Sequence, residues 1–263
     1  MTLLTVRGRG PSVYRRLGAL GRAELTLLAR NRGALVTALL MPLALPFSVR
    51  PAVDQMELKA RGLSIGTVTV TAAIGFCFLF AVYTTLVGAY VARREELVLK
   101  RLRTGELEDA EILAGTALPA VCVGLTQSLV LAVGCAVLLG AGPPRAPYLT
   151  VLGVLSGLVL SAALAALTAS FTRTVESAQI TALPLVVVSM VGSGMAIPTE
   201  ILPARLSSAC ALLPLSPAIR LVRGGWTGEL STGAALASLA LTLAWTLTAV
   251  FAVRRWFRWE PRR

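Results

Sequence analysis

Six long apolar runs, none containing Asp, Glu, Lys or Arg, set the strongest constraint on how this chain folds. They cover residues 33–49, 64–91, 112–140, 148–172, 177–199 and 230–253. About 20 apolar residues in a helix cross the ~30 Å hydrocarbon layer of a bilayer. The chain is also 56% apolar and only 14% charged, whereas about 25% is usual in soluble domains. We therefore predict an all-α membrane protein with six transmembrane helices.

The segments around these runs complete the predicted domain. Residues 1–32 mix leucines with arginines, which predicts an N-terminal amphipathic helix lying on the membrane surface. A cleaved signal peptide is the alternative, but the charged leader is long and no small-residue cleavage site precedes Arg50. No repeat or linker divides the chain, so we expect one domain over 1–263, with six spans in 33–253 and a tail in 254–263.

The distribution of Lys and Arg predicts the orientation. With both termini in the cytoplasm, eighteen of these residues lie inside and seven outside, as the positive-inside rule favours. The net charge of +12 then reflects topology and anionic headgroups rather than nucleic-acid binding. The preference for Arg over Lys, with abundant Ala, Gly and Leu, suggests a bacterial plasma membrane.

The stretch between the fifth and sixth runs, residues 198–229, is too apolar for a free loop and too short for two crossings. It contains Pro198, Pro203, Pro214 and Pro217, followed by Arg220. We predict one or two short helices there, forming a re-entrant hairpin in the outer leaflet.

Several kinds of chemistry are excluded by residues that the chain lacks. It has no histidine, so His-dependent catalysis and His-ligated metals are unavailable. It has no phosphate-binding Gly-rich loop, and its only lysines are Lys59 and Lys100. We predict no catalytic or metal site and no cofactor in this chain. Because no charged group lies at membrane depth, energy for uphill transport has to come from another polypeptide.

The connection after the second run, residues 92–115, is the most informative polar stretch, and we call it the inner loop. Its first half predicts a helix continuing out of the second span, with Glu96 and Lys100 paired at i,i+4. Thr104 and Gly105 end that helix, and acidic residues then open a short second helix that leads into the third span. An ordinary solvated turn is the alternative to a partner-docking surface.

Polar and aromatic side chains inside the spans give a candidate substrate path: Phe76, Phe80, Tyr83, Thr84, Gln127 and Gln179. Structural bonding between helices is the alternative for the amides, and lipid contact is the alternative for the aromatic residues.

Small residues recur every fourth position in the third and fourth runs. Gly124 belongs to one stripe, and Gly153 and Gly157 belong to the other. Such faces let helices approach closely, so we predict that these two spans pack against each other. A substrate groove is the alternative.

Two motifs resemble the membrane subunits of type-2 ABC transporters, the group that includes daunorubicin-type drug-efflux permeases. The inner loop supplies Arg93, Glu96, Leu99, Arg101 and Leu102, then Glu108, Ala110, Glu111, Ile112, Leu113 and Gly115. It departs from the family in having Leu97–Val98 in place of Gly-Thr and Gly105–Glu106 in place of Pro. The outer stretch supplies Ile197–Pro198, Leu202–Pro203, the run from Leu213 to Pro217, Arg220 and Arg223.

This resemblance implies a permease that forms a dimer, expected to be a homodimer, on two copies of a separate ATP-binding subunit. ATP and Mg²⁺ would bind that partner, and the complex would export an amphipathic drug-like compound or lipid. The residues expected to couple the two subunits are Arg93, Glu96, Arg101, Glu106, Glu108, Asp109 and Glu111. A facilitator or secondary carrier working without ATP is the alternative, and a membrane scaffold or immunity protein that binds a toxin is another.

Overall fold

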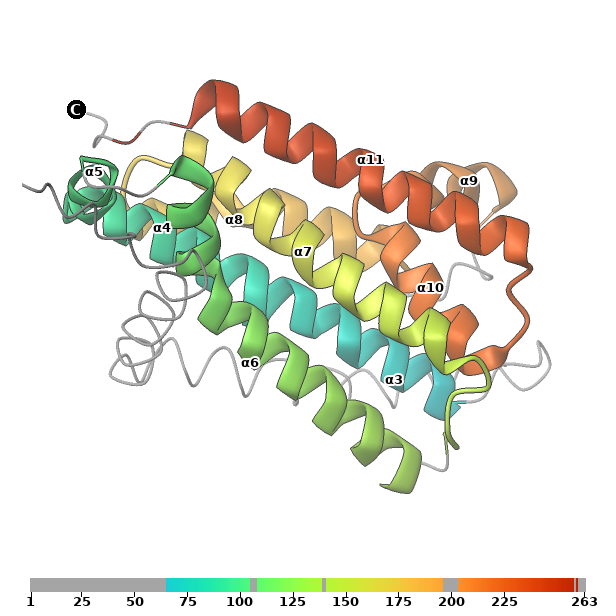
Figure 1. Ribbon diagram of the computed structural model, residues 1–263. Helices are drawn as coiled ribbons and strands as arrows, with labels where there is room; N and C mark the ends of the chain where they lie inside the picture. The colour runs from blue at the N-terminus through green and yellow to red at the C-terminus, as the bar shows by residue number, and fades with distance from the viewer. Residues whose placement is uncertain (1–64, 105–107, 139–140, 196–202, 258, 260–263) are drawn as a thin grey trace, which may run out of the picture.

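The computed structural model describes residues 65–104, 108–138, 141–195, 203–257 and 259, which form a bundle of helices (Figure 1). The helices are α3 (Ile65–Phe76), η2 (Cys77–Thr84), α4 (Thr85–Glu95), α5 (Val98–Arg103), α6 (Asp109–Leu138), α7 (Pro147–Phe171), α8 (Val175–Gly192), α9 (Ala204–Ala211), α10 (Ser216–Thr227) and α11 (Thr232–Trp256). The predicted N-terminal helix, the first span, Pro198 and Glu106 lie outside the described residues.

Five helical segments among the described residues are long and apolar enough to cross a membrane. They are Ile65–Glu95, Asp109–Val137, Pro147–Phe171, Val175–Gly192 and Thr232–Trp256. They coincide with the second to sixth apolar runs, which confirms the multi-pass, helical prediction for this part of the chain.

The fifth run is the one whose predicted end is wrong. We expected helix to residue 199, but α8 ends at Gly192. Ser193 caps it, and Gly194 adopts the left-handed conformation with φ 75°. Glycine reaches that conformation without steric cost, so the chain turns there.

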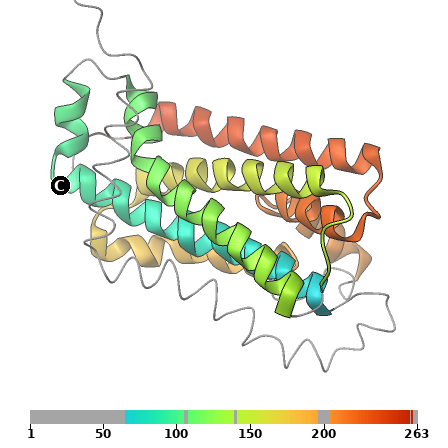
Figure 2. The same ribbon diagram turned by 60° about the horizontal axis from the view of Figure 1, so that its bottom comes forward.

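Span two, made of α3, η2 and α4, is the most buried of the five. It lies among α6, α7 and α8 in two views (Figures 1 and 2). Phe76, Phe78 and Tyr83 have no exposed surface. Lipid contact, the alternative given above for the aromatic residues, is therefore wrong for these side chains.

The middle of span two has π-helical hydrogen bonding over Cys77–Thr84. At its end, the Thr85 hydroxyl donates to the Phe80 carbonyl, five residues back, at 2.9 Å. π segments inside α-helices are rare and are often found at functional sites. Nothing in the sequence predicted this one.

The small-residue stripes of α6 and α7 contact span two as well as each other. A Cβ on Gly124 would lie 2.5 Å from Cγ2 of Val82 and 3.0 Å from Cδ2 of Leu158. Gly157 faces the Phe78 ring. The predicted packing of α6 against α7 is confirmed at Gly124 and Leu158, and the stripes also make room for the bulky side chains of span two.

The stretch before span six forms two short helices, α9 and α10, as predicted. α10 is packed into the bundle, and nine of its twelve residues are buried. It lies against α7 at Gly153, where a Cβ would come within 2.8 Å of the Val222 nitrogen. In Figure 1, α9 and α10 lie at the opposite end of the bundle from α5. We refer to the two ends as the α5 end and the α10 end.

Candidate functional site

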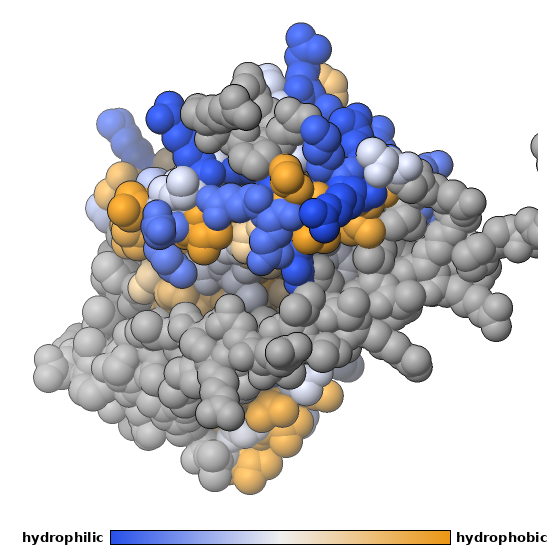
Figure 3. Space-filling model, turned by 90° about the vertical axis from the view of Figure 1, so that its left-hand side faces the viewer, coloured by the Kyte–Doolittle hydropathy of each residue, from blue (hydrophilic) through white to orange (hydrophobic). Residues whose placement is uncertain are grey.

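Charged side chains gather at the α5 end, where α4 ends, α6 begins, α7 turns into α8 and α11 ends. Figure 3 looks onto this end and shows hydrophilic side chains across its upper part. The inner loop, identified above from the sequence, accounts for much of this charge.

The turn between α4 and α5 differs from the predicted continuous helix. α4 ends at Glu95, and Leu97 adopts φ 58° in the left-handed region before α5 starts. Glu96 consequently pairs with Arg93, at 3.3 Å, within the end of α4. The predicted pairing of Glu96 with Lys100 is wrong, because the turn separates these two residues onto different helices.

α5 lies on the surface and is anchored by a single apolar residue. Leu99 is its one buried side chain, with no exposed surface. Arg103 Nε donates to Asp109 Oδ1 at 3.0 Å, and its guanidinium lies 5.1 Å from the centroid of the Trp259 ring. The exposed remainder, which includes Lys100 and Arg101, forms a basic surface.

The acidic half of the inner loop opens α6 directly. The predicted separate short helix is wrong, because α6 runs without interruption from Asp109 to Leu138. Asp109 and Glu111 occupy its first turn, where negative charge complements the helix dipole. Glu111 Oε2 also accepts a hydrogen bond from the Glu108 backbone N–H at 3.0 Å.

Arg94, beside the predicted Arg93, is the residue that fixes this region to the bundle. Its side chain is 1% exposed. Nη1 donates to the Ala169 carbonyl at 2.9 Å, and Nη2 donates to the carbonyls of Thr172 and, at 3.3 Å, Arg173. These oxygens lie at the C-terminal end of α7, where carbonyls lack partners within the helix and cations are favoured.

Glu95 makes the complementary contact with the next helix. Its Oε1 accepts a hydrogen bond at 3.1 Å from the backbone N–H of Val175, the first residue of α8. Arg94 and Glu95 together form what we call the α7–α8 clasp: a cation on the end of one helix and an anion on the start of the next. The sequence predicts charge here but gives no signal for which arginine is buried.

Tyr90 joins the same end of span two to α6. Its hydroxyl donates to the Leu113 carbonyl at 3.0 Å, and its side chain is 2% exposed. The sequence analysis missed this residue as well as the clasp. The segment that precedes α5 is thus connected to α6, α7 and α8 by hydrogen bonds.

The six residues of the candidate substrate path do not share one environment. Phe76 and Tyr83 are fully buried, and the Tyr83 hydroxyl lies 2.9 Å from the Thr168 hydroxyl on α7. Phe80 is partly buried beside Phe76, whereas Gln179 is exposed on α8. The two remaining residues, Gln127 and Thr84, are buried on α6 and partly buried on η2, respectively.

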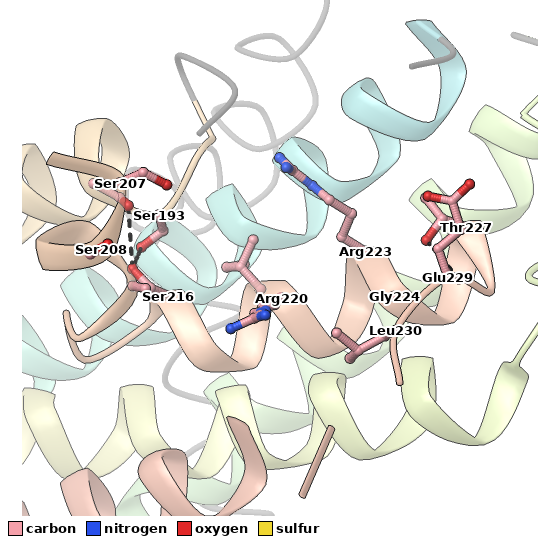
Figure 4. Close-up of a pocket in the computed structure, with 13 residues that line it drawn as sticks. Ser193, Ser207, Ser208, Ser216, Arg220, Arg223, Gly224, Thr227, Glu229 and Leu230 are labelled. Atoms are coloured by element: carbon pink, nitrogen blue, oxygen red, sulfur yellow. Dashed lines mark hydrogen bonds between the residues drawn. The ribbon is translucent and has the colours of Figure 1, made fainter. Parts of the chain in front are cut away.

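The α10 end carries a separate pocket of about 470 Å³. Figure 4 shows serines at one end of it, Thr227 and Glu229 at the other, and Arg220 and Arg223 between them. The Ser216 hydroxyl donates to Ser193 at 3.1 Å. Of the predicted hairpin residues, Arg220 lines this pocket, Pro217 is buried in the first turn of α10, Pro203 caps α9 and Pro214 lies between the two helices.

The comparisons with known proteins agree with this architecture. The family model of the ABC-2 type transporter matches residues 15–226, well over half of the chain, and this range includes the whole inner loop and most of α10. No curated protein sequence matches the chain. The match, the apolar spanning helices and the inner loop between the first two described spans are consistent with one another. The chain therefore belongs to the ABC-2 type transporter family, as a membrane permease component of an ABC transporter.

Proposed function

We propose that this chain is the permease subunit of an ATP-driven exporter and that a separate ATP-binding subunit docks on the inner loop. The observation that carries the proposal is the contrast between α5, which is exposed, and the end of α4, which is fixed to the bundle by hydrogen bonds. α5 buries only Leu99, whereas the residues just before it are fixed by the α7–α8 clasp and by Tyr90.

This geometry suits the transmission of force. A partner that pushed α5 would move the end of α4, and the clasp would carry that displacement to α7 and α8 together. Movement of packed helices as units between two arrangements is the usual basis of alternating access. ATP and Mg²⁺ would bind the partner, and closure of the partner would supply the energy for transport.

The charge distribution supports a cytoplasmic location for the α5 end. Among the described residues, that end carries eight cationic side chains and the α10 end carries four. The eight are Arg93, Arg94, Lys100, Arg101, Arg103, Arg173, Arg254 and Arg255; the four are Arg145, Arg205, Arg220 and Arg223. By the positive-inside rule the α5 end faces the cytoplasm. We propose that both termini lie there, in a bacterial plasma membrane.

We further propose that two copies of this permease form a homodimer and that the cargo is an amphipathic drug-like compound or lipid. In this arrangement α9 and α10 form the outer re-entrant hairpin. A rearrangement that opens the spans toward the α10 end would release the cargo on the outer side.

The decisive experiment replaces Glu108, Asp109 and Glu111 together by Lys and measures whether a vanadate-sensitive ATPase still co-purifies with the tagged permease. We expect loss of the ATPase and of export. Glu229→Lys, an exposed carboxylate at the α10 end, is the control and keeps both.

Because the triple replacement also places cations at the start of α6, a second variant tests docking without that complication. Arg101→Glu changes an exposed side chain of α5 and leaves the helix start intact. Unchanged export by both variants in inserted protein would overturn the proposal and favour a carrier that needs no ATP.

A further inference from the structure

A second cavity, of about 720 Å³, lies at the α5 end between α6, α7 and α11. We call it the lateral groove. Its lining combines an apolar part with a charged rim. The residues are Tyr90, Arg103, Glu108, Asp109, Ala110, Leu113, Ala114, Ala117, Ala162, Ala163, Ala166, Val250, Val253, Arg254, Phe257 and Trp259.

Six alanines line the groove. Ala110, Ala114 and Ala117 follow one another along a face of α6, and Ala162, Ala163 and Ala166 do so on α7. A methyl group projects little from a helix, so the space between these helices and α11 stays open where larger side chains would fill it. On the α11 side, Val250, Val253 and Phe257 complete an apolar wall.

The groove continues into a surface that faces the membrane. On α7, Val159 is 56% exposed and Leu155 is 47% exposed, and both precede Ala162 and Ala163 on the same face at helical spacing. Figure 1 shows α7 in front, between α6 and α11. In a spanning bundle, exposed leucine and valine side chains at this position contact lipid.

The rim of the groove has the composition of a membrane interface. Arg103 and Arg254 supply two positive charges, and Glu108 and Asp109 supply two negative charges. Trp259 lies beside them, edge to face with Phe257 at 5.1 Å between ring centroids, and Trp is enriched at headgroup level. The rim thus has positive and negative side chains next to an apolar groove. Such a rim complements a lipid headgroup that carries both a positive and a negative charge.

We propose that the lateral groove binds one phospholipid of the adjacent leaflet, with a headgroup containing a phosphate and an ammonium. The phosphate lies against the arginines of the rim, the ammonium lies against the carboxylates, and an acyl chain runs along the alanine wall. Since Arg103 and Asp109 also connect α5 to α6, the headgroup contacts the inner loop directly.

The test uses the full-length protein in vesicles that contain a zwitterionic phosphatidylethanolamine probe with a photoreactive acyl chain. We expect cross-linking to concentrate on the α6, α7 and α11 residues of the groove. Ala163→Phe fills the groove and should reduce this labelling about tenfold. Ala237→Phe, at an exposed alanine of α11 outside the groove, should leave it unchanged.

A second pair of variants tests the headgroup. Arg254→Gln removes a rim cation and should lower labelling by the same probe, whereas its neighbour Arg255, which does not line the groove, should tolerate Gln. An anionic phosphatidylglycerol probe lacks the ammonium and should label the groove less than the zwitterionic probe does.

Two outcomes would overturn the proposal. Labelling spread evenly over exposed apolar faces, and insensitive to Ala163→Phe, would show that the groove holds no particular lipid. Cross-linking of two permeases through Ala163→Cys would show that a second copy covers the groove. Neither outcome bears on the co-purification of an ATPase, so this inference and the proposed function fail independently.

Discussion

α10 and α5 are both short helices, one at each end of the bundle, yet they are held in opposite ways. Nine of the twelve residues of α10 are buried, and its backbone touches α7 where Gly153 leaves room. α5 buries one of six residues. α10 is part of the core, whereas α5 is exposed to solvent and is attached to the fixed end of α4. Deep packing therefore fixes the α10 end, and the α5 end keeps the free surface that a partner requires.

The largest effect is expected where α10 meets α7. Gly153→Leu places a side chain where even a Cβ would be 2.8 Å from the Val222 nitrogen. Overpacking of this kind should cost about 3 kcal/mol or more, and little folded protein should survive extraction. The measurement is the yield of monodisperse protein in mild detergent.

The matched control for this change is Gly134→Leu on α6, because a Cβ built there meets no atom within 4 Å apart from its chain neighbours and the nearby backbone of its own helix. It should give a normal yield. Equal losses from the two replacements would mean that α10 is not held by close packing on α7.

The next largest effect is expected in the α7–α8 clasp. Arg94→Ala leaves buried carbonyls at the end of α7 without their donor, at a cost of about 2–3 kcal/mol in the free energy of unfolding. Thermal unfolding checks the stability, and ATP-dependent transport checks the coupling; both should fall.

Arg93→Ala is the comparison for the clasp. The Arg93 side chain is 14% exposed and pairs with Glu96, whose side chain is 59% exposed, and a pair that is open to solvent on one side contributes about 1 kcal/mol or less. Equal destabilisation by Arg93→Ala and Arg94→Ala would contradict the view that the clasp is what fixes the end of α4, and with it α5, to the bundle.

A local effect is expected from Leu99→Ala. The cavity should cost α5 about 2 kcal/mol, but the loss concerns the anchoring of one surface helix rather than the bundle. Hydrogen exchange at the amides of Val98–Arg103 should accelerate while the unfolding temperature of the bundle changes little. A large fall in the unfolding temperature of the whole bundle would instead show that α5 is part of the core, as α10 is.

The smallest effect is expected from Leu97→Gly in the turn before α5. A left-handed conformation costs a non-glycine residue about 1–2 kcal/mol, part of which is offset by the greater freedom of an unfolded glycine. Stability should rise by a few tenths of a kcal/mol, as measured by thermal unfolding. A marked fall would show that the Leu97 side chain, 39% exposed here, is needed for packing.

The sequence predicted the five described spans well because the absence of charge over about 20 residues is a local property. The end of α8 was misplaced because residues 193–199 also lack charged side chains, so hydropathy gives no sign of the turn at Gly194. The acidic start of α6 was recognised from charge alone. Arg93 and Arg94 could not be told apart, since their burial depends on α7, some 75 residues away.

Side-chain environments inside the bundle were the least predictable. The sequence left Phe76 and Tyr83 open to either lipid contact or substrate contact, because a helix that is apolar on every side has no periodic signal. The π segment likewise depends on hydrogen bonding that no residue pattern specifies. The lateral groove arises where alanines of α6 and α7 face each other, which required the two helices to be placed in space.

The Arg94 half of the clasp has a chemistry that does not respond to acidity. Arg94 is held by peptide carbonyls of Ala169, Thr172 and Arg173, groups that carry no titratable proton. A guanidinium stays charged throughout the physiological pH range. These three hydrogen bonds therefore do not depend on pH within that range, so neither does the connection they make between span two and the end of α7.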